Sequence, residues 1–153
     1  MSALRQPYFN ITSKPVVAQD VRTQIGNTPL LSFQRITQHL PTDVQVYAKA
    51  EWSNPGGSVK DRAAHEIVQQ ALADGRLGDG KILMDSTSGN TGIAYAMLGA
   101  AYGFGVKLFL PKNASPERIA ILNAYGVDIT FTDPLEGSDG AIRAVRQLAN
   151  EDP

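Results

Sequence analysis

The pattern of apolar and polar residues is weak at the start of the chain and regular from residue 44 onward. Apolar residues alternate with polar ones over 44–50 and again over 127–131, which is typical of half-buried strands. Unbroken apolar runs predict two fully buried strands at 81–84 and 106–110. Helical periodicity separates the strands, and the predicted helices are 59–73, 91–102, a segment from Pro116 to near Gly126, and a last segment that Ser138 caps.

The order of these elements predicts an α/β fold. Strands and helices alternate with short connections, and such a chain forms an open parallel sheet with helices on both faces. We expect about four strands in this sheet. The two unbroken apolar strands are the better candidates for its central pair, because central strands are covered on both faces. The two alternating strands would lie nearer the edges.

The first 43 residues follow a different pattern. Turn-forming residues interrupt them at Gly26, Asn27, Pro29 and Pro41, so this segment predicts an N-terminal arm with one or two short strands. We therefore divide the chain into an arm over 1–43, which would pack on a second domain missing from this sequence, and an α/β domain over 44–153.

The composition excludes several classes of protein. The 14 basic and 15 acidic residues nearly cancel, so no net field attracts nucleic acid or an anionic membrane. No apolar run approaches the roughly 20 residues of a membrane span, and the first 25 residues lack the apolar core of a signal peptide. Without cysteine, and with two histidines, the chain cannot build a thiolate or histidine metal centre. We expect a cytoplasmic protein without a metal.

Lys60 stands at the start of the predicted helix over 59–73. The apolar residues of this helix form two adjacent columns with a spacing of four, and Lys60 heads the column that continues with Ala64, Val68 and Leu72. A lysine in that position points inward or into a cleft. The outer face would then carry Asp61, Arg62, His65 and Glu66.

The start of a helix suits a reactive amine. Ser58 and Asp61 have the spacing of a capping box, which places Lys60 in the first turn. A helix N-terminus carries partial positive charge and burial disfavours an ammonium group, whereas the neutral amine is the form that attacks an aldehyde. The alternative is a lysine whose stem follows the helix surface to solvent. Position alone does not decide between the two.

A second glycine-rich turn, TSGNTG at 87–92, joins a buried strand to a helix. Hydroxyls, a side-chain amide and backbone N–H groups meet there at the carboxyl end of a parallel strand, the edge where open α/β sheets bind ligands. Free N–H groups at a helix start favour an anion such as a carboxylate. The alternative is a turn whose Ser, Thr and Asn side chains only cap the helix.

Three segments together resemble the cysteine synthase and cystathionine β-synthase family, the fold-type II enzymes that use pyridoxal 5′-phosphate (PLP). They are IGNTPL at 25–30, NPGGSVKDR at 54–62 and TSGNTG at 87–92. Each is weak alone, but their order and the 30-residue step from Lys60 to Asn90 make the set specific. The similarity runs from about residue 20 to the C-terminus and covers only the N-terminal part of such an enzyme.

The resemblance implies the chemistry of the site. Lys60 would hold PLP as a Schiff base, and Asn90 would hydrogen-bond the 3′-oxygen of the cofactor. The α-carboxylate of the substrate would be bound by Thr87, Ser88, Gly89 and Thr91. The implied reaction is β-replacement in a homodimer: Lys60 removes the α-proton of O-acetylserine or O-phosphoserine, the side-chain leaving group departs, and sulfide adds to give cysteine.

One departure from the family pattern limits what this chain does alone. The phosphate-binding loop of the family, rich in Gly and Thr, lies in the second half of its enzymes, and nothing after Lys60 supplies it here. Such enzymes are roughly twice as long as this chain, a size typical of two-domain proteins. We interpret the chain as a fragment.

Two alternatives stay open. One is a serine or threonine dehydratase or a cystathionine β-synthase on the same fold. The other, from a different class, is a non-catalytic remnant that binds amino acids or pairs with another subunit.

Overall fold

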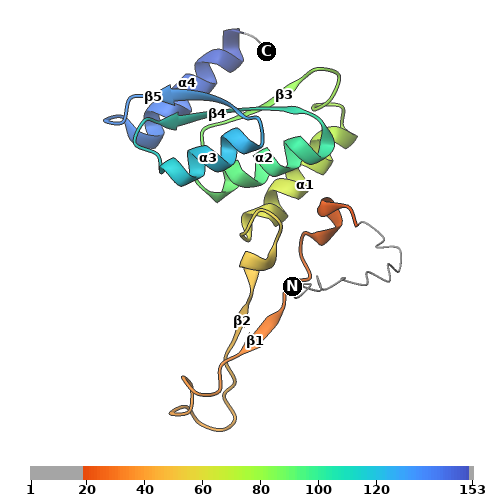
Figure 1. The fold of residues 1–153 in the computed structure, drawn as a ribbon, viewed down its shortest axis with the longest axis vertical. Helices are drawn as coiled ribbons and strands as arrows, with labels where there is room; N and C mark the ends of the chain where they lie inside the picture. The colour runs from red at the N-terminus through yellow and green to blue at the C-terminus, as the bar shows by residue number, and fades with distance from the viewer. Residues whose placement is uncertain (1–18, 152–153) are drawn as a thin grey trace, which may run out of the picture.

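The computed structural model describes residues 19–151. Predictions about residues 1–18, including part of the arm, lie outside the described residues. The elements in chain order are η1 (Val21–Gln24), β1 (Leu30–Ser32), β2 (Tyr47–Lys49), η2 (Glu51–Ser53), α1 (Lys60–Ala73), β3 (Ile82–Asp85), α2 (Asn90–Tyr102), β4 (Gly105–Pro111), α3 (Pro116–Ala124), β5 (Asp128–Thr132) and α4 (Gly137–Glu151), as Figure 1 shows.

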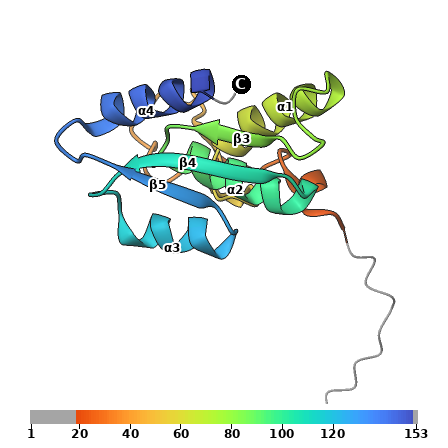
Figure 2. The same cartoon turned by 90° about the horizontal axis from the view of Figure 1, so that it is seen from above.

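The α/β fold is confirmed. β3, β4 and β5 form a parallel sheet in that order, with Leu83 opposite Val106 and Leu108 opposite Ile129. α4 packs on one face of this sheet, while α2 packs on β4 from the other face with α3 beside it (Figure 2). α1 packs mainly against α2.

The expected strand over 44–50 is present but belongs to a different sheet. β2 pairs antiparallel with β1, with Leu31 opposite Ala48, so the described parallel sheet has three strands and not four. Alternation shows that a strand is half-buried but not which strand it pairs with. β4 is central as predicted. β3, expected beside it at the centre, lies at an edge of the described sheet, where Ile82 is 49% exposed.

The core lies between α2 and the sheet. Gly92–Gly99 of α2 are all buried, as the nearly complete apolar character of this helix predicted. Leu98, Leu108, Leu110 and Leu122 are almost fully shielded from solvent. Gly99 lets α2 approach β4 closely, because a Cβ at this position would lie 2.5 Å from Cγ2 of Val106.

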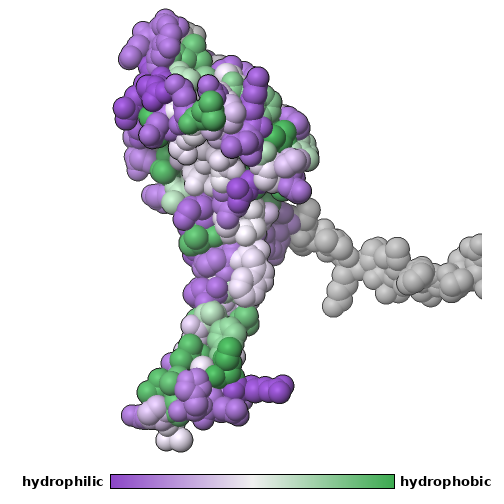
Figure 3. Space-filling view, turned by 90° about the vertical axis from the view of Figure 1, so that its left-hand side faces the viewer, coloured by the Kyte–Doolittle hydropathy of each residue, from purple (hydrophilic) through white to green (hydrophobic). Residues whose placement is uncertain are grey.

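The arm, which we define as β1, β2 and the loop between them (residues 30–49), projects away from the α/β layer (Figure 1). It has little core of its own. Leu30 is 58% exposed and Ile36 is 72% exposed, and Figure 3 shows apolar side chains gathered over the far end of the arm.

In residues 19–151, no helix is both long and apolar enough to cross a membrane.

Candidate active site

Lys60 is the first residue of α1 and its side chain is exposed in the described chain. The predicted place in the first turn is therefore confirmed. The buried column below it begins at Ala64 and continues with Val68, both almost fully buried against α2. No element among residues 19–151 buries Lys60.

The residues around Lys60 hold the helix start differently from the predicted capping box. The N-cap of α1 is Val59, which makes no side-chain cap, and the N–H of Lys60 donates to Oγ of Ser58 at 3.2 Å. The carboxylate of Asp61 accepts instead from the N–H of Gly56, at 2.5 Å.

Of the four residues assigned to the outer face of α1, Glu66 is exposed and Arg62 is half-buried, and the other two are covered by neighbouring parts of the chain. Asp61 is 0% exposed, so that prediction was wrong, and burial raises the pKa of its carboxyl. His65 is half-buried, with Nε2 3.1 Å from the hydroxyl of Tyr102 on α2. Helical periodicity assigned both by their polarity and could not register the neighbouring loop and helix that cover them.

The second predicted segment forms the turn between β3 and α2. Thr87, Ser88 and Gly89 are half-buried, as is Thr91, whereas Asn90 is exposed and is the first residue of α2. The N–H of Gly89 lies 3.4 Å from Oγ1 of Thr87, a weak local hydrogen bond. The turn therefore has internal capping and also leaves polar side chains at the surface.

The fold brings the two segments to one edge of the sheet. α1 and α2 pack side by side (Figure 1). In the sequence β3 follows α1 and precedes α2, so the chain reverses direction at each end of β3. Both helices therefore begin at the carboxyl end of β3, the edge where open α/β sheets bind ligands. This topology directs the start of α1, at Lys60, and the start of α2, at the Thr87–Thr91 turn, toward the same end of the sheet.

A polar network joins the root of the arm to α1, and sequence reasoning missed it. Both nitrogens of a guanidinium fork from Arg62 bind the carboxylate of Glu51, at 2.9 and 3.0 Å. Thr28 donates to the same carboxylate at 2.9 Å. Asn54 donates to it at 2.9 Å and accepts from the N–H of Gly26 at 2.9 Å. We call Thr28, Glu51, Asn54 and Arg62 the polar junction.

In the polar junction the charge of Glu51 is compensated by Arg62. The hydrogen bonds from Arg62 lower the pKa of Glu51 from 4.5 to about 2. Thr28 and Asn54 are 5% and 3% exposed. The signal that could have found this network was the presence of all four residues in or beside the IGNTPL and NPGGSVKDR segments.

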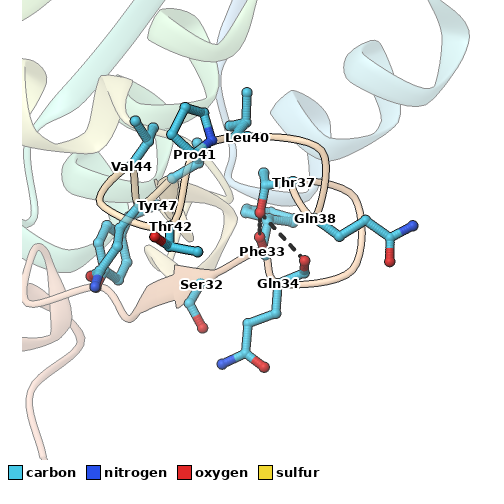
Figure 4. Close-up of a pocket in the computed structure, with 12 residues that line it drawn as sticks. Ser32, Phe33, Gln34, Thr37, Gln38, Leu40, Pro41, Thr42, Val44 and Tyr47 are labelled. Carbon is cyan, nitrogen blue, oxygen red and sulfur yellow. Dashed lines mark hydrogen bonds between the residues drawn. The ribbon is translucent and has the colours of Figure 1, made fainter.

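A pocket lies elsewhere, in the arm. The loop between β1 and β2 borders a cavity of about 490 Å³, lined by residues such as Phe33, Leu40 and Tyr47 (Figure 4). Oγ1 of Thr37 donates to the carbonyl of Phe33 within this loop. The cavity shares no residue with the predicted site.

The predicted residues fit part of PLP. Lys60 offers an amine for an aldehyde, Asn90 offers an exposed amide for a ring oxygen, and the hydroxyls of the Thr87–Thr91 turn suit a carboxylate. The hydroxyls of this set are assigned to the substrate carboxylate, so the set includes no separate group for the phosphate of the cofactor. The same side chains do not suggest a metal centre: within residues 19–151, no three His, Cys, Asp or Glu side chains gather as metal ligands would.

Residues 21–153 match the protein family described as pyridoxal-phosphate dependent enzymes. The chain belongs to this family. The predicted resemblance is thereby confirmed, and so is PLP as the cofactor of the family.

The pyridoxal-phosphate dependent relatives include several cysteine synthases. The cysteine synthase of Aquifex aeolicus is 50% identical over 130 residues, which cover 84% of this chain and 40% of that protein. The crystal structure of cysteine synthase from Entamoeba histolytica superposes with a TM-score of 0.86 at 35% identity, covering 100% of this chain and 44% of that one. The O-acetylserine dependent cystathionine β-synthase of Bacillus subtilis is 38% identical over 135 residues, covering 88% of this chain and 43% of that protein.

The chain thus spans less than half the length of the curated relatives it matches. The residues that match the family model include the segment NPGGSVKDR at 54–62.

Proposed function

We propose that this chain carries the lysine-bearing part of a PLP-dependent enzyme that makes cysteine by β-replacement on O-acetylserine or O-phosphoserine with sulfide. The observation that carries the proposal is that Lys60 and the Thr87–Thr91 turn stand at the starts of α1 and α2, two helices that pack against each other. The similarity to cysteine synthases over most of the chain supports it.

Each residue has a proposed role at this edge. Lys60 holds the cofactor through its amine and later takes the α-proton of the substrate at Nζ. The side-chain amide of Asn90 donates to the 3′-oxygen of the cofactor. The substrate carboxylate is oriented by Thr87, Ser88, Gly89 and Thr91. When bound, PLP withdraws electrons from the α-carbon, and the protein supplies orientation and the proton carrier.

The direct test is covalent trapping. The 153-residue chain is mixed with PLP, reduced with borohydride and digested, and the modified peptides are mapped by mass spectrometry. We expect a pyridoxyl group concentrated on Lys60, lost in Lys60→Ala and retained in the matched control Lys112→Ala, which removes another exposed lysine. Equal labelling of all accessible lysines would reject the role of Lys60.

Cystathionine β-synthase activity is the alternative that a specific observation favours, because a relative of that name is 38% identical. A serine or threonine dehydratase on the same fold stays a weaker alternative. Assays with O-acetylserine plus sulfide, serine plus homocysteine, and threonine alone separate the three, provided they use the chain together with the missing part of the enzyme.

The limited share of its relatives' length that this chain covers supports a non-catalytic role for the chain by itself. The matched segment is 40% of the Aquifex relative, and the predicted site residues include no separate group for the phosphate. We infer that the isolated chain reacts with PLP at Lys60 but does not turn over. Cysteine formation by the purified 153-residue chain would overturn this inference.

We further propose that the N-terminal segment 1–43, which includes β1, contacts the remainder of the enzyme. Residues 44–153 are then the domain that carries the lysine. The exposed apolar side chains of Leu30 and Ile36 support this. Homodimer formation, a cytoplasmic location, and the lack of nucleic-acid or membrane binding stay predictions from the sequence.

A further inference from the structure

Asp61 is the most fully buried acidic side chain among the described residues, and it directly follows Lys60. Its Oδ2 accepts from the N–H of Gly56 at 2.5 Å, across the loop that leads to Lys60. Its Oδ1 has no hydrogen-bond partner among the described residues. A buried carboxylate with an unsatisfied oxygen costs free energy of folding, so stability does not explain why the chain places one here.

The contact between the two residues demands a glycine at position 56. A Cβ built there would lie 2.5 Å from Oδ1 and 2.9 Å from Oδ2 of Asp61. Gly56 does not have a left-handed φ, so its backbone conformation is open to other residues. The close approach of the carboxylate is therefore what excludes a side chain.

The loop is held at its other points as well. Asn54, at its start, is 3% exposed and bonded to both Gly26 and Glu51. Ser58 accepts from the N–H of Lys60 at its end. Asp61 closes the middle of the loop onto α1, so that the segment from Asn54 to Lys60 forms one fixed turn whose last residue carries the amine.

We propose that Asp61 is a positioning residue for Lys60: its carboxylate fixes the N–H of Gly56 and thereby the loop that presents the amine to the Thr87–Thr91 turn. This inference rests on the proposed role of Lys60. Removing the carboxylate frees the loop and lowers the reactivity of Lys60 even where the fold persists. An amide at position 61 keeps an oxygen acceptor for Gly56 and so retains the position.

The test compares Asp61→Ala, Asp61→Asn and the control Glu66→Gln, which removes a negative charge from an exposed position on the same helix. All are treated with PLP and borohydride while folded, and labelling of Lys60 is measured relative to Lys112 in the same molecule. We expect this ratio to fall roughly tenfold or more in Asp61→Ala, as for a displaced reactive group. It should stay near the wild-type ratio in Asp61→Asn and Glu66→Gln.

Amide hydrogen exchange gives a second readout that does not depend on the cofactor. The N–H of Gly56 should be protected in wild type and in Asp61→Asn, and exposed to exchange in Asp61→Ala. If Asp61→Ala does not fold, Gly56→Ala breaks the same contact from the other side and should lower the Lys60 ratio likewise.

The possible failures are distinguishable. Equal labelling of Lys60 and Lys112 in wild type rejects the proposed function, and the inference with it. Selective labelling of Lys60 in wild type, unchanged in folded Asp61→Ala or Gly56→Ala, overturns the positioning role and leaves the function standing. A loss of selectivity in Asp61→Asn equal to that in Asp61→Ala also overturns the inference as stated, because the acceptor for Gly56 is then not what matters.

Discussion

The α/β layer and the arm of this chain are held together by different forces. In the layer, α2 is buried along eight consecutive residues and the leucines of β4 are almost fully shielded. In the arm, two strands of three residues each carry apolar side chains that solvent reaches. A two-stranded hairpin is marginal by itself, so the arm depends on the polar junction at its root. The described residues thus have one buried core, in the layer, and an extension whose apolar side chains stay exposed.

The largest contrast is expected from truncating one apolar side chain in each region. Leu108→Ala should lower the free energy of unfolding by about 2–5 kcal/mol, because it empties a fully buried site. Ile36→Ala should change it by less than about 0.5 kcal/mol, because that side chain is 72% exposed. Urea titrations followed by circular dichroism measure both. Equal losses would show that the arm has a core of its own.

A smaller effect is expected from overpacking the layer at one point. Gly99→Ala places a methyl group 2.5 Å from Val106 and should cost about 1–3 kcal/mol as α2 moves away from β4. Ala100→Ser, on the exposed side of the same helix, is the control and should be nearly neutral. A stable Gly99→Ala variant would mean that α2 and β4 are less tightly apposed than the described contact.

The polar junction should respond to acid before the layer does. The folded pKa of Glu51 is lowered from 4.5 to about 2, so its ion pair stabilises the chain above pH 4.5 and this contribution fades as the pH falls from 4.5 toward 2. Hydrogen exchange should therefore quicken in the arm, relative to intrinsic rates, over this range while β4 stays protected. In Glu51→Gln the arm should exchange fast at every pH, and a wild-type-like pH dependence in that variant would contradict the account.

The smallest effect concerns Asp61. Its pKa is raised by burial, so the stability it provides is present below its ordinary pKa of 3.8 and is lost as the pH rises through the raised folded value. Asp61→Asn carries no such charge and should unfold at a slightly higher urea concentration than wild type near neutral pH. An Asp61→Asn variant that is clearly less stable at neutral pH would show that the charge is compensated by a group not described here.

Much of the layer could be predicted because its signals are local. The helix predicted over 59–73 is α1 at Lys60–Ala73, and the turn at Thr87–Gly92 opens α2. Both predictions depend on the periodicity and the turn residues of a single segment. The partner of the 44–50 strand could not be predicted, since β1 is three residues long and gives no period. Whether a strand joins a parallel sheet or an antiparallel pair depends on contacts between distant residues.

The sequence pointed to candidate site residues but not to the contacts around them. Motif order points to Lys60 and Asn90, and both are the first residues of helices. Asp61 and Glu51 were not found as buried or bonded groups, because a charged residue in a helical pattern is assigned to solvent unless its partner is known. The partner of Asp61 lies 5 residues away, in the loop before α1, and the partner of Glu51 lies 11 residues away, on α1.

The central claim is that Lys60 and the Thr87–Thr91 turn form one site for a PLP-like ligand. Titration of the isotopically labelled 153-residue chain with PLP, followed by amide chemical shifts, tests it directly. We predict shifts concentrated at Lys60 and at Thr87–Thr91 that disappear in Lys60→Ala. Shifts confined to the arm, or a pattern at the turn that persists unchanged in Lys60→Ala, would contradict the claim.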